Sequence, residues 1–328
     1  MISWLTVLGL GVCRAAFCSL GVHGSRHCAG TPSRHEFVAC AEDDWREVRA
    51  RLVADEASAT ARSQREYVFE SPLIEEGTVL VDATNGGHCT SDIFYHKSVM
   101  LLLKHVQGKD GFTYGLMLNR PSALMLDGWR LWFGGPVDEG GLFDMPRHPT
   151  DIEGERNRAV LCLHSLGRGG DDGRSESAAA AAETFSKPVV PGIWYTTLEA
   201  AQLLVDRGAA CKGDFCCFVG YVGWAPSQLR GEVESGAWLL ASADSRTIRE
   251  LLACATAFDP PPYSEGDDDD DAEGGTLDCI LSWERVVRSI GREELIELPL
   301  SGRRAAADAD RALAEWGRAK LLPPRPEV

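Results

Sequence analysis

Two side chains that could hold an anion stand together at the end of a predicted strand. Asn119 is the last residue of the predicted strand 112–119, and Arg120 lies between it and Pro121. Pro121 restricts Arg120 to an extended conformation at a strand end, where functional groups are often presented. An amide and a guanidinium fork placed there could bind a carboxylate or a phosphate. The alternative is structural: Asn119 caps the turn and Arg120 pairs with a surface acid.

Backbone and aromatic groups later in the chain could complete such a pocket. Gly134 and Gly135 form a predicted tight turn whose N–H groups could face an anion, although a plain turn fits the same residues. Tyr221, Trp224 and Gln228 could line an apolar wall with polar tips, or the rings could simply pack in the core. The predicted binding site therefore contains Asn119, Arg120, Gly134, Gly135, Tyr221, Trp224 and Gln228.

His88 and His105 are the best candidates for proton transfer, because both are expected near strand ends. If they converged with Asn119 and Arg120, the chain could be a hydrolase acting on a small phosphorylated or nucleotide-like molecule. Histidines with ordinary structural hydrogen bonds are the alternative. The sequence has no nucleophile elbow, phosphate-binding loop or dinucleotide-binding glycine motif, and no cluster with metal-ligand spacing. We therefore predict no catalytic residue, no metal and no cofactor.

Charge and cysteine content narrow the class of protein. The 328 residues carry a net charge of -16, and nucleic-acid binding would require a basic face that such a chain must concentrate locally. No such basic stripe is evident outside the termini, so direct nucleic-acid binding is disfavoured. The 11 cysteines include no CxxC pair, so buried free thiols in a reducing compartment are expected.

The stretch Asp214–Ser242 is rich in glycine and aromatic residues and is predicted to organise the fold. Phe215–Val222 is apolar or small throughout, as in a strand covered on both faces. A turn and a helix at Ser227–Ser235 follow, and a second buried strand is predicted at Ala237–Ser242. Further strands are expected at Thr78–Ala83, Ser98–Val106, Phe112–Asn119, Trp129–Phe133, Ala159–His164 and Gly192–Thr196.

The N-terminal segment is typical of a targeting sequence. Residues 1–35 combine an apolar run at 4–12 with an acid-free continuation that contains arginine and serine. This combination predicts a two-part leader directing the protein to the plastid, with a secretory signal as the alternative. The apolar run is too short to span a membrane. The predicted organisation is a cleavable leader at 1–40, a helical extension at 41–70, a domain at 71–300 with flexible insertions at 167–184 and 259–275, and a tail at 301–328.

Three blocks of sequence, in order, resemble one family. They are GTVLVDA with IFYHKSVMLLLKHV and GFTYGLMLNRP, then LWFGGPVDEGGLFDM, then FVGYVGWAPSQLRGEVESGAWLLAS, and they span roughly residues 75–290. This pattern resembles the YqgE/AlgH family, and DWREVRARLVADE near the N-terminus is similar to the version found in photosynthetic eukaryotes. The chain departs from the bacterial pattern at Ala225-Pro226-Ser227, which replaces a more glycine-rich turn.

The resemblance implies an α+β fold: a single compact domain on a mixed, strongly curved, barrel-like sheet with flanking helices. Bacterial members have been discussed as regulators, and the family supplies no catalytic residues to carry over. The resemblance therefore implies a non-catalytic plastid protein that is regulatory, or that binds a small anionic ligand or a partner protein. Neither direct nucleic-acid binding nor a membrane span in the mature protein is expected.

Overall fold

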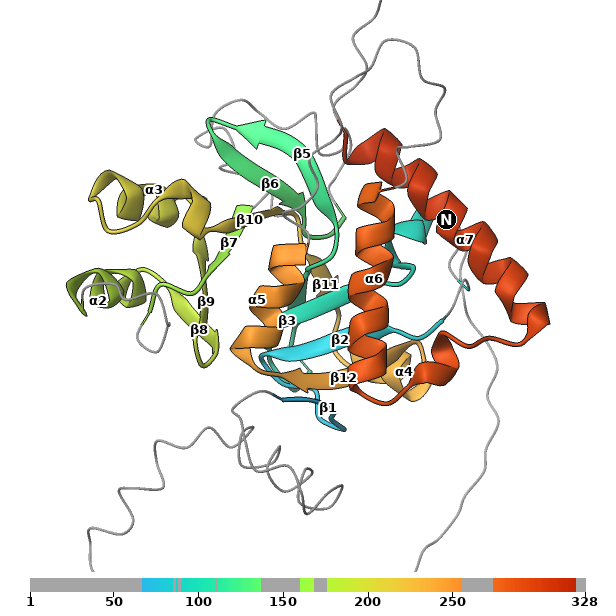
Figure 1. Ribbon diagram of the computed structural model, residues 1–328. Helices are drawn as coiled ribbons and strands as arrows, with labels where there is room; N and C mark the ends of the chain where they lie inside the picture. Colours follow the sequence, from blue (N-terminus) through green and yellow to red (C-terminus); the bar gives the residue numbers. More distant parts are fainter. Residues whose placement is uncertain are drawn as a thin grey trace, which may run out of the picture. The chain divides into compact units, whose positions relative to one another are not determined.

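The computed structural model describes residues 67–84, 87, 90–109, 111–136, 160–167, 176–254 and 274–322 (Figure 1). All of these residues belong to one compact unit, Asp44–Val328. The predicted leader, the predicted extension up to residue 66 and most of the predicted insertion at 259–275 lie outside the described residues. Among the described helices, none is long and apolar enough to cross a bilayer.

Six strands form sheet A, in which every neighbouring pair is antiparallel. Its central strands are nearly continuous apolar runs, and all five residues of β2 are buried. Such runs are expected where both faces of a sheet are covered, because no position then faces water. In spatial order the strands are β1 (Val68–Glu70), β12 (Trp238–Ala243), β2 (Thr78–Asp82), β3 (Val99–His105), β4 (Thr113–Met117) and β11 (Val222–Trp224).

Six further strands form sheet B, which is mixed because β10 pairs parallel with β6 and antiparallel with β7. In spatial order they are β5 (Pro121–Leu126), β6 (Trp129–Phe133), β10 (Cys216–Val219), β7 (Val160–His164), β9 (Ile193–Thr197) and β8 (Lys187–Val190). The predicted α+β class is confirmed. The prediction of one barrel-like sheet is wrong, because the described strands form two open sheets, each ending in edge strands.

The two sheets meet where the chain passes from one into the other. β4 continues into β5, and β10 continues into β11 through Gly220, so the predicted single strand 215–222 is divided between the sheets. Gly220 has a φ of +73°, a conformation that turns the chain out of the strand direction and favours glycine. Gly134 joins the layers, since its carbonyl accepts from Met117 N (2.9 Å) and its N–H donates to Val219 O (2.8 Å).

Gly134 and Gly135 permit this crossing because a side chain at either position would not fit. A Cβ atom on Gly135 would lie 2.3 Å from the carbonyl carbon of Tyr221. One on Gly134 would lie 2.5 Å from the carbonyl oxygen of Gly220. Both distances are far shorter than van der Waals contact. The two glycines therefore serve close packing of backbone against backbone.

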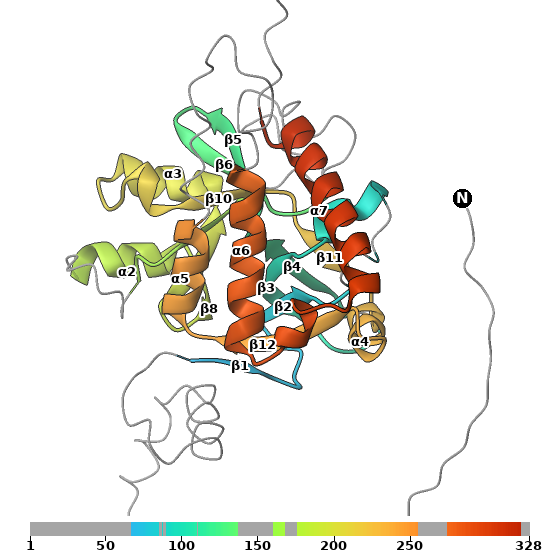
Figure 2. The same ribbon diagram turned by 45° about the vertical axis from the view of Figure 1, so that its right-hand side comes forward.

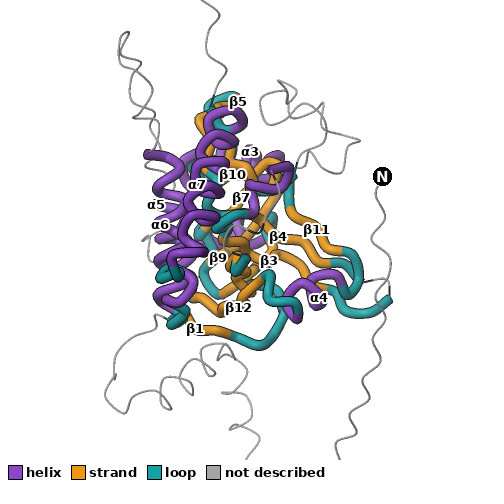
Figure 3. Tube along the Cα trace, turned by 90° about the vertical axis from the view of Figure 1, so that its right-hand side faces the viewer, coloured by secondary structure: helices purple, strands orange, loops and turns teal. Residues whose placement is uncertain are grey.

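Helices cover both faces of sheet A. α5 (Ser245–Cys254) and α6 (Gly274–Ser289) lie on one side of the strands, and α4 (Gln228–Glu234) lies on the other (Figure 3). Ile248 and Trp283 from the first side belong to a buried cluster with residues of β2 and β3. The cluster on the second side joins α4 to sheet B. Alternate residues of the sheet A strands thus enter two different cores.

The remaining helices flank sheet B and the end of sheet A (Figure 2). α3 (Leu198–Asp206) packs on β7 and β9, and α2 (Glu176–Thr184) precedes β8. Residues 176–184 were predicted to lie in a flexible insertion, but they form α2 and bury Ala182. In the predicted tail, α7 (Leu300–Lys320) packs against the short 3-10 segment η2 (Thr90–Tyr95).

Substituting Gly135→Ala should destabilise the protein strongly, because the new methyl group would collide with the Tyr221 backbone, which cannot move aside as a side chain could. We expect a loss of about 2–4 kcal/mol in the free energy of unfolding, measured by urea titration. Gly231→Ala is the matched control: this exposed glycine in α4 has open space around its Cβ position. Helix propensity predicts a gain of up to about 1 kcal/mol there. Equal effects of the two variants would contradict the close-packing role.

Candidate functional site

Asn119 is fully buried and ties three segments together. Its Oδ1 accepts from Val99 N (3.0 Å), and its Nδ2 donates to the carbonyl oxygens of Lys97 and Cys279 (2.9 Å each). These partners lie at the start of β3, in the preceding turn and on α6. The amide therefore satisfies backbone groups that would otherwise be buried without partners.

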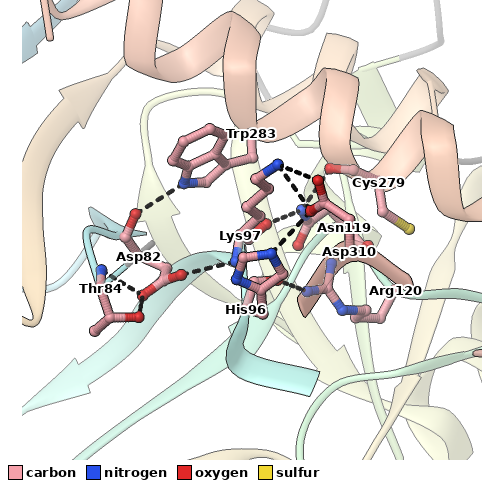
Figure 4. Close-up of polar contacts among 9 residues, drawn as sticks. All are labelled: Asp82, Thr84, His96, Lys97, Asn119, Arg120, Cys279, Trp283 and Asp310. Atoms are coloured by element: carbon pink, nitrogen blue, oxygen red, sulfur yellow. Dashed lines mark hydrogen bonds and ion pairs between the residues drawn. The ribbon is translucent and has the colours of Figure 1, made fainter. Parts of the chain in front are cut away.

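Arg120 is 1% exposed and points into the protein (Figure 4). Its Nε donates to Phe94 O (3.1 Å), Nη1 to Asn119 O (2.9 Å) and Nη2 to His96 O (2.5 Å). Burial lowers the pKa of the guanidinium, an effect partly offset by Cys279 and by the Asp82 carboxylate. The fork thus holds η2 and the following turn by their carbonyl groups. Neither Asn119 nor Arg120 presents a side chain to solvent.

Asp82 organises the other side of this buried polar group. Its Oδ2 accepts from Lys97 N (2.7 Å), and its Oδ1 accepts from the amide and the hydroxyl of Thr84 (3.0 and 2.8 Å). Its backbone carbonyl accepts from the indole of Trp283 on α6 (2.8 Å). Lys97 has a φ of +52°, a left-handed conformation that is costly for a residue with a side chain. The bond to Asp82 helps to hold it.

Asp310 brings α7 to the same place. Its carboxylate lies 2.8 Å from His96 Nε2, and Lys97 Nζ is 2.8 and 2.9 Å from its two oxygens. Burial raises the pKa of this carboxyl, but the hydrogen bonds from His96 and Lys97 outweigh burial and hold the pKa below its usual value. One carboxylate on the last helix therefore faces two nitrogen groups in the turn after η2.

Trp224 and Gln228 converge on a residue that the sequence reasoning missed, Glu232. The indole N–H groups of Trp224 and Trp238 both donate to Glu232 Oε2 (2.9 and 2.8 Å), and Gln228 Nε2 donates to Oε1 (2.8 Å). The spacing of Gln228 and Glu232, four residues apart in a predicted helix, was the available signal. Tyr221 is not part of this group, because it packs with the cluster on the other side of sheet A.

The predicted convergence around His105 is absent from the part of the chain described here. His88 lies outside the described residues. His105 Nδ1 is 2.8 Å from Thr113 Oγ1 at the start of β4, whereas Asn119 follows the end of that strand. Six residues of extended chain separate Thr113 from Asn119, a distance of about 20 Å. His105 and Arg120 therefore cannot act on one small substrate at this separation.

His164 and Ser186 form a pair that resembles a catalytic dyad, but the histidine has the wrong tautomer. The ring is 4% exposed, and burial lowers its pKa to about 4, so it is neutral at pH 7. Leu166 N donates to His164 Nδ1 (3.2 Å), so Nε2 carries the proton and donates to Ser186 Oγ (2.7 Å). A general base must instead accept the hydroxyl proton. The pair holds strand β7 to the segment before β8.

Among the described cysteines, Cys162 and Cys217 form a buried pair. Cys162 and Cys217 face each other across β7 and β10 with 3.1 Å between their sulfur atoms. Both are free and fully buried, and burial holds the pKa of the Cys162 thiol well above its usual value. A protonated thiol is a poor nucleophile. Over the described ranges, no group of three histidine, cysteine or acidic side chains is placed to hold a metal ion.

Comparison with known proteins identifies the family. The model of the family described as AlgH-like matches residues 88–255. The chain belongs to the AlgH-like family. The matched segment contains all seven residues of the predicted binding site and ends where α5 ends, before α6 and α7.

Curated relatives of this AlgH-like protein carry the name UPF0301. One from Nocardia farcinica is 26% identical over 200 residues, covering 56% of this chain and 74% of the relative. Another, MCA0413 1 from Methylococcus capsulatus, is 31% identical over 173 residues, covering 48% and 75%. Two solved structures are similar at 20% identity and a TM-score of 0.36: DIP2367 from Corynebacterium diphtheriae covers 54% of this chain and 80% of its own, and AlgH from Pseudomonas aeruginosa covers 57% and 89%.

Replacing Arg120→Ala should unfold the protein more readily, because three buried carbonyl groups would lose their donors. We expect a loss of about 3–5 kcal/mol in the free energy of unfolding by urea titration. Arg288→Ala, at an arginine that is 53% exposed and pairs with Glu284 on its own helix (3.1 Å), should cost under about 1 kcal/mol. An Arg120→Ala protein that kept its stability and lost affinity for an anion would support the sequence-based interpretation instead.

The stability contributed by Asp310 should depend on pH. Because its folded-state pKa is lowered, its contribution is complete above the unfolded-state value of about 3.9 and is lost as the pH falls through the folded value. Asp310→Asn should therefore cost about 1–2 kcal/mol at pH 7 and progressively less as the pH is lowered below about 4, measured by urea unfolding. Asp308→Asn, at an exposed position of the same helix, should show no such difference. A cost that did not change with pH would refute the charged contact.

Proposed function

We propose that this AlgH-like protein is a non-catalytic regulatory module that acts by binding a partner protein. One argument against catalysis supports this proposal. The polar side chains that could do chemistry form hydrogen bonds with other groups of the chain. Arg120 and Asn119 donate to backbone carbonyls, and His164 donates to Ser186. These hydrogen bonds stabilise the fold. For the described residues, a binding role is therefore the favoured interpretation.

The single observation that carries the proposal is an exposed aromatic residue beside an edge of sheet A that no described strand covers. β11 is the last strand of sheet A, and Trp224 pairs with Thr113, so Phe112 lies next to the end of that edge. The Phe112 side chain is 49% exposed. Its ring is stacked parallel on Tyr114 with 6.1 Å between centroids. Val106, its neighbour across the β3–β4 hairpin, is 37% exposed.

This combination suits an extended peptide that adds to the sheet. An edge strand offers unpaired backbone groups to a partner strand, while neighbouring pockets select its side chains. Gly223, in the middle of β11, has no side chain to screen the backbone. A large aromatic ring that is ordered before binding supplies contact area at low entropic cost. We propose that the partner contributes an extended segment along β11 with an apolar side chain against Phe112.

Only some of the predicted binding residues lie at the proposed surface. Tyr221 precedes β11, Trp224 ends it, and Gln228 is exposed at the start of α4. Gly134 and Gly135 pack on the backbone just before β11 and so position the edge. Asn119 and Arg120 support the fold from inside. A small anionic ligand is the less favoured occupant, because the guanidinium expected to hold it is buried.

For localisation we propose delivery to the plastid through the leader at residues 1–40. The main support is the sequence composition: an apolar run followed by an arginine- and serine-containing stretch without acids. The similarity to the version of the family found in photosynthetic eukaryotes agrees with that proposal. N-terminal sequencing of the protein isolated from its own cells tests it, and an intact Met1 would contradict it.

The partner-binding proposal can be tested by photo-crosslinking from two exposed positions. A benzoylphenylalanine at position 112 should crosslink to one partner protein, because the ring lies beside the edge that the partner is proposed to cover. The same probe at Met125, which is 57% exposed on β5 in sheet B, is the matched control and should not capture that partner. Phe112→Ala should weaken binding by about 2 kcal/mol or more. Capture from both positions, or from neither, would count against this surface.

A further inference from the structure

α7 packs against the AlgH-like core with few large side chains. Its described buried face consists of Ala306, Ala309 and Leu313, with Trp316 half-buried beyond them. Alanines bury little apolar area, so the hydrophobic stabilisation of this helix rests mainly on Leu313, Trp316 and the buried C-cap residue Leu321, whose carbonyl also accepts from Ala123 N (2.9 Å). A 21-residue helix attached by so few large residues is a candidate for local opening while the core stays folded.

The surface beneath α7 is an aromatic groove, which we call the α7 groove and define by Ile93, Phe94, His96, Lys97 and Phe133. Ile93 packs against Ala309 and Leu313. The ring of Trp316 lies 5.8 Å from Phe94 and 5.1 Å from Phe133 between centroids. Aromatic rings at this spacing are typical of the grooves that bind one face of an amphipathic helix.

The groove also has a polar end that selects an acid. His96 and Lys97 both reach the Asp310 carboxylate, at 2.8 Å each (Figure 4). His96 is fully buried, and its other ring nitrogen, Nδ1, is buried without a hydrogen-bond partner. The Lys97 backbone is held in its left-handed conformation by Asp82, which belongs to the core and not to α7. The backbones that carry the two nitrogen groups are therefore held by core residues, Lys97 by Asp82 and His96 by Arg120, and these bonds would survive the loss of α7.

The residues of the α7 groove lie inside the segment that matches the AlgH-like family, and α7 lies outside it. Every residue of the α7 groove lies within the segment 88–255 matched to the AlgH-like family, while α7 begins 45 residues after that segment (300 against 255). A connection of ten residues, 290–299, joins α6 to α7 and contains the 3-10 turn η9 (Glu293–Leu295). A surface formed by the matched family segment is thus covered by a helix from outside that segment.

From these observations we propose that the α7 groove is a binding site for an amphipathic helix of a partner protein that carries one carboxylate facing His96 and Lys97, and that α7 occupies it in the free protein as an internal competitor. The partner helix would place apolar residues at the positions of Ala309, Leu313 and Trp316 and a carboxylate at that of Asp310. Because α7 is covalently attached, its effective concentration at the groove is high. A partner helix must therefore bind the groove more tightly than α7 does in order to displace it. This site is built from other elements than the β11 edge, so it does not depend on the binding proposed there.

Peptide binding to the full-length protein tests this proposal. The probe is a fluorescein-labelled peptide of residues 299–322, and binding is followed by fluorescence anisotropy. The wild-type protein and a variant with a loosened α7, Leu313→Ser with Trp316→Ser, are compared. We expect the loosened variant to bind the peptide at least tenfold more tightly than the wild type does, because its own helix competes less well.

Two matched peptides test the acid preference of the groove. A peptide with Asp310→Asn should bind the loosened variant at least fivefold more weakly, whereas one with Asp308→Asn should bind unchanged, since Asp308 is exposed. A designed peptide that keeps only the residues at 306, 309, 310, 313 and 316, with all other positions replaced, should bind within threefold of the natural one. That result would show that the groove recognises the pattern and not α7 as a whole.

Several results would overturn the proposal. One is a loosened variant that is folded by circular dichroism yet does not bind the peptide. Another is an equal loss of affinity for the Asp310→Asn and Asp308→Asn peptides. If the loosened variant did not fold, hydrogen exchange of the wild type decides: α7 amides should exchange well before those of β2 and β3, and equal protection would refute a releasable helix. A wild-type dimer that exchanges α7 between copies would make the second copy the occupant and refute the partner assignment.

Discussion

The structure depends on how one buried positive charge is satisfied. Removing the guanidinium of Arg120 from water is costly unless acceptors replace the solvent, and here three backbone carbonyl oxygens do so. Two of them belong to η2 and the turn after it, and the third is that of Asn119. Because Arg120 lies between β4 and β5, its bonds fix the corner at which the chain leaves sheet A for sheet B. The position of one side chain thus sets the relation of two sheets.

The same corner holds the helices that follow the matched family segment. Asn119 donates to Cys279 O on α6, and the Asp82 carbonyl accepts from Trp283 on the same helix. The turn after η2, whose carbonyl groups Arg120 and Asn119 hold, supplies the contacts to Asp310 on α7. α6 is thereby attached mainly through a buried core. α7 is attached through one carboxylate, a few apolar residues and one backbone bond at its C-terminal end, from Ala123 N to Leu321 O, which is why the two helices are expected to differ in ease of opening.

These interactions are the reason for proposing a binding role over a catalytic one. Catalysis requires polar groups that are positioned but not fully engaged, so that they can act on a substrate. Here Arg120, Asn119, Glu232 and His164 are engaged with other parts of the chain. The features proposed for recognition are the β11 edge beside Phe112, which no described strand covers, and the α7 groove. Both are recognition surfaces that use backbone groups and aromatic rings.

The sequence by itself determined the positions of most strands, the α+β class and the family. Apolar runs such as 129–133 and 78–83 needed no tertiary information, because strand formation there follows from local pattern. It also indicated that Gly134 and Gly135 are special, although not that backbone packing is the reason. Only the tertiary structure decided that 215–222 is divided between two sheets, since a single positive φ at Gly220 redirects the chain. Likewise, two of the three carbonyl groups that turn Arg120 inward belong to residues 24 and 26 positions away. A local sequence pattern cannot show which distant backbone groups need a hydrogen-bond donor.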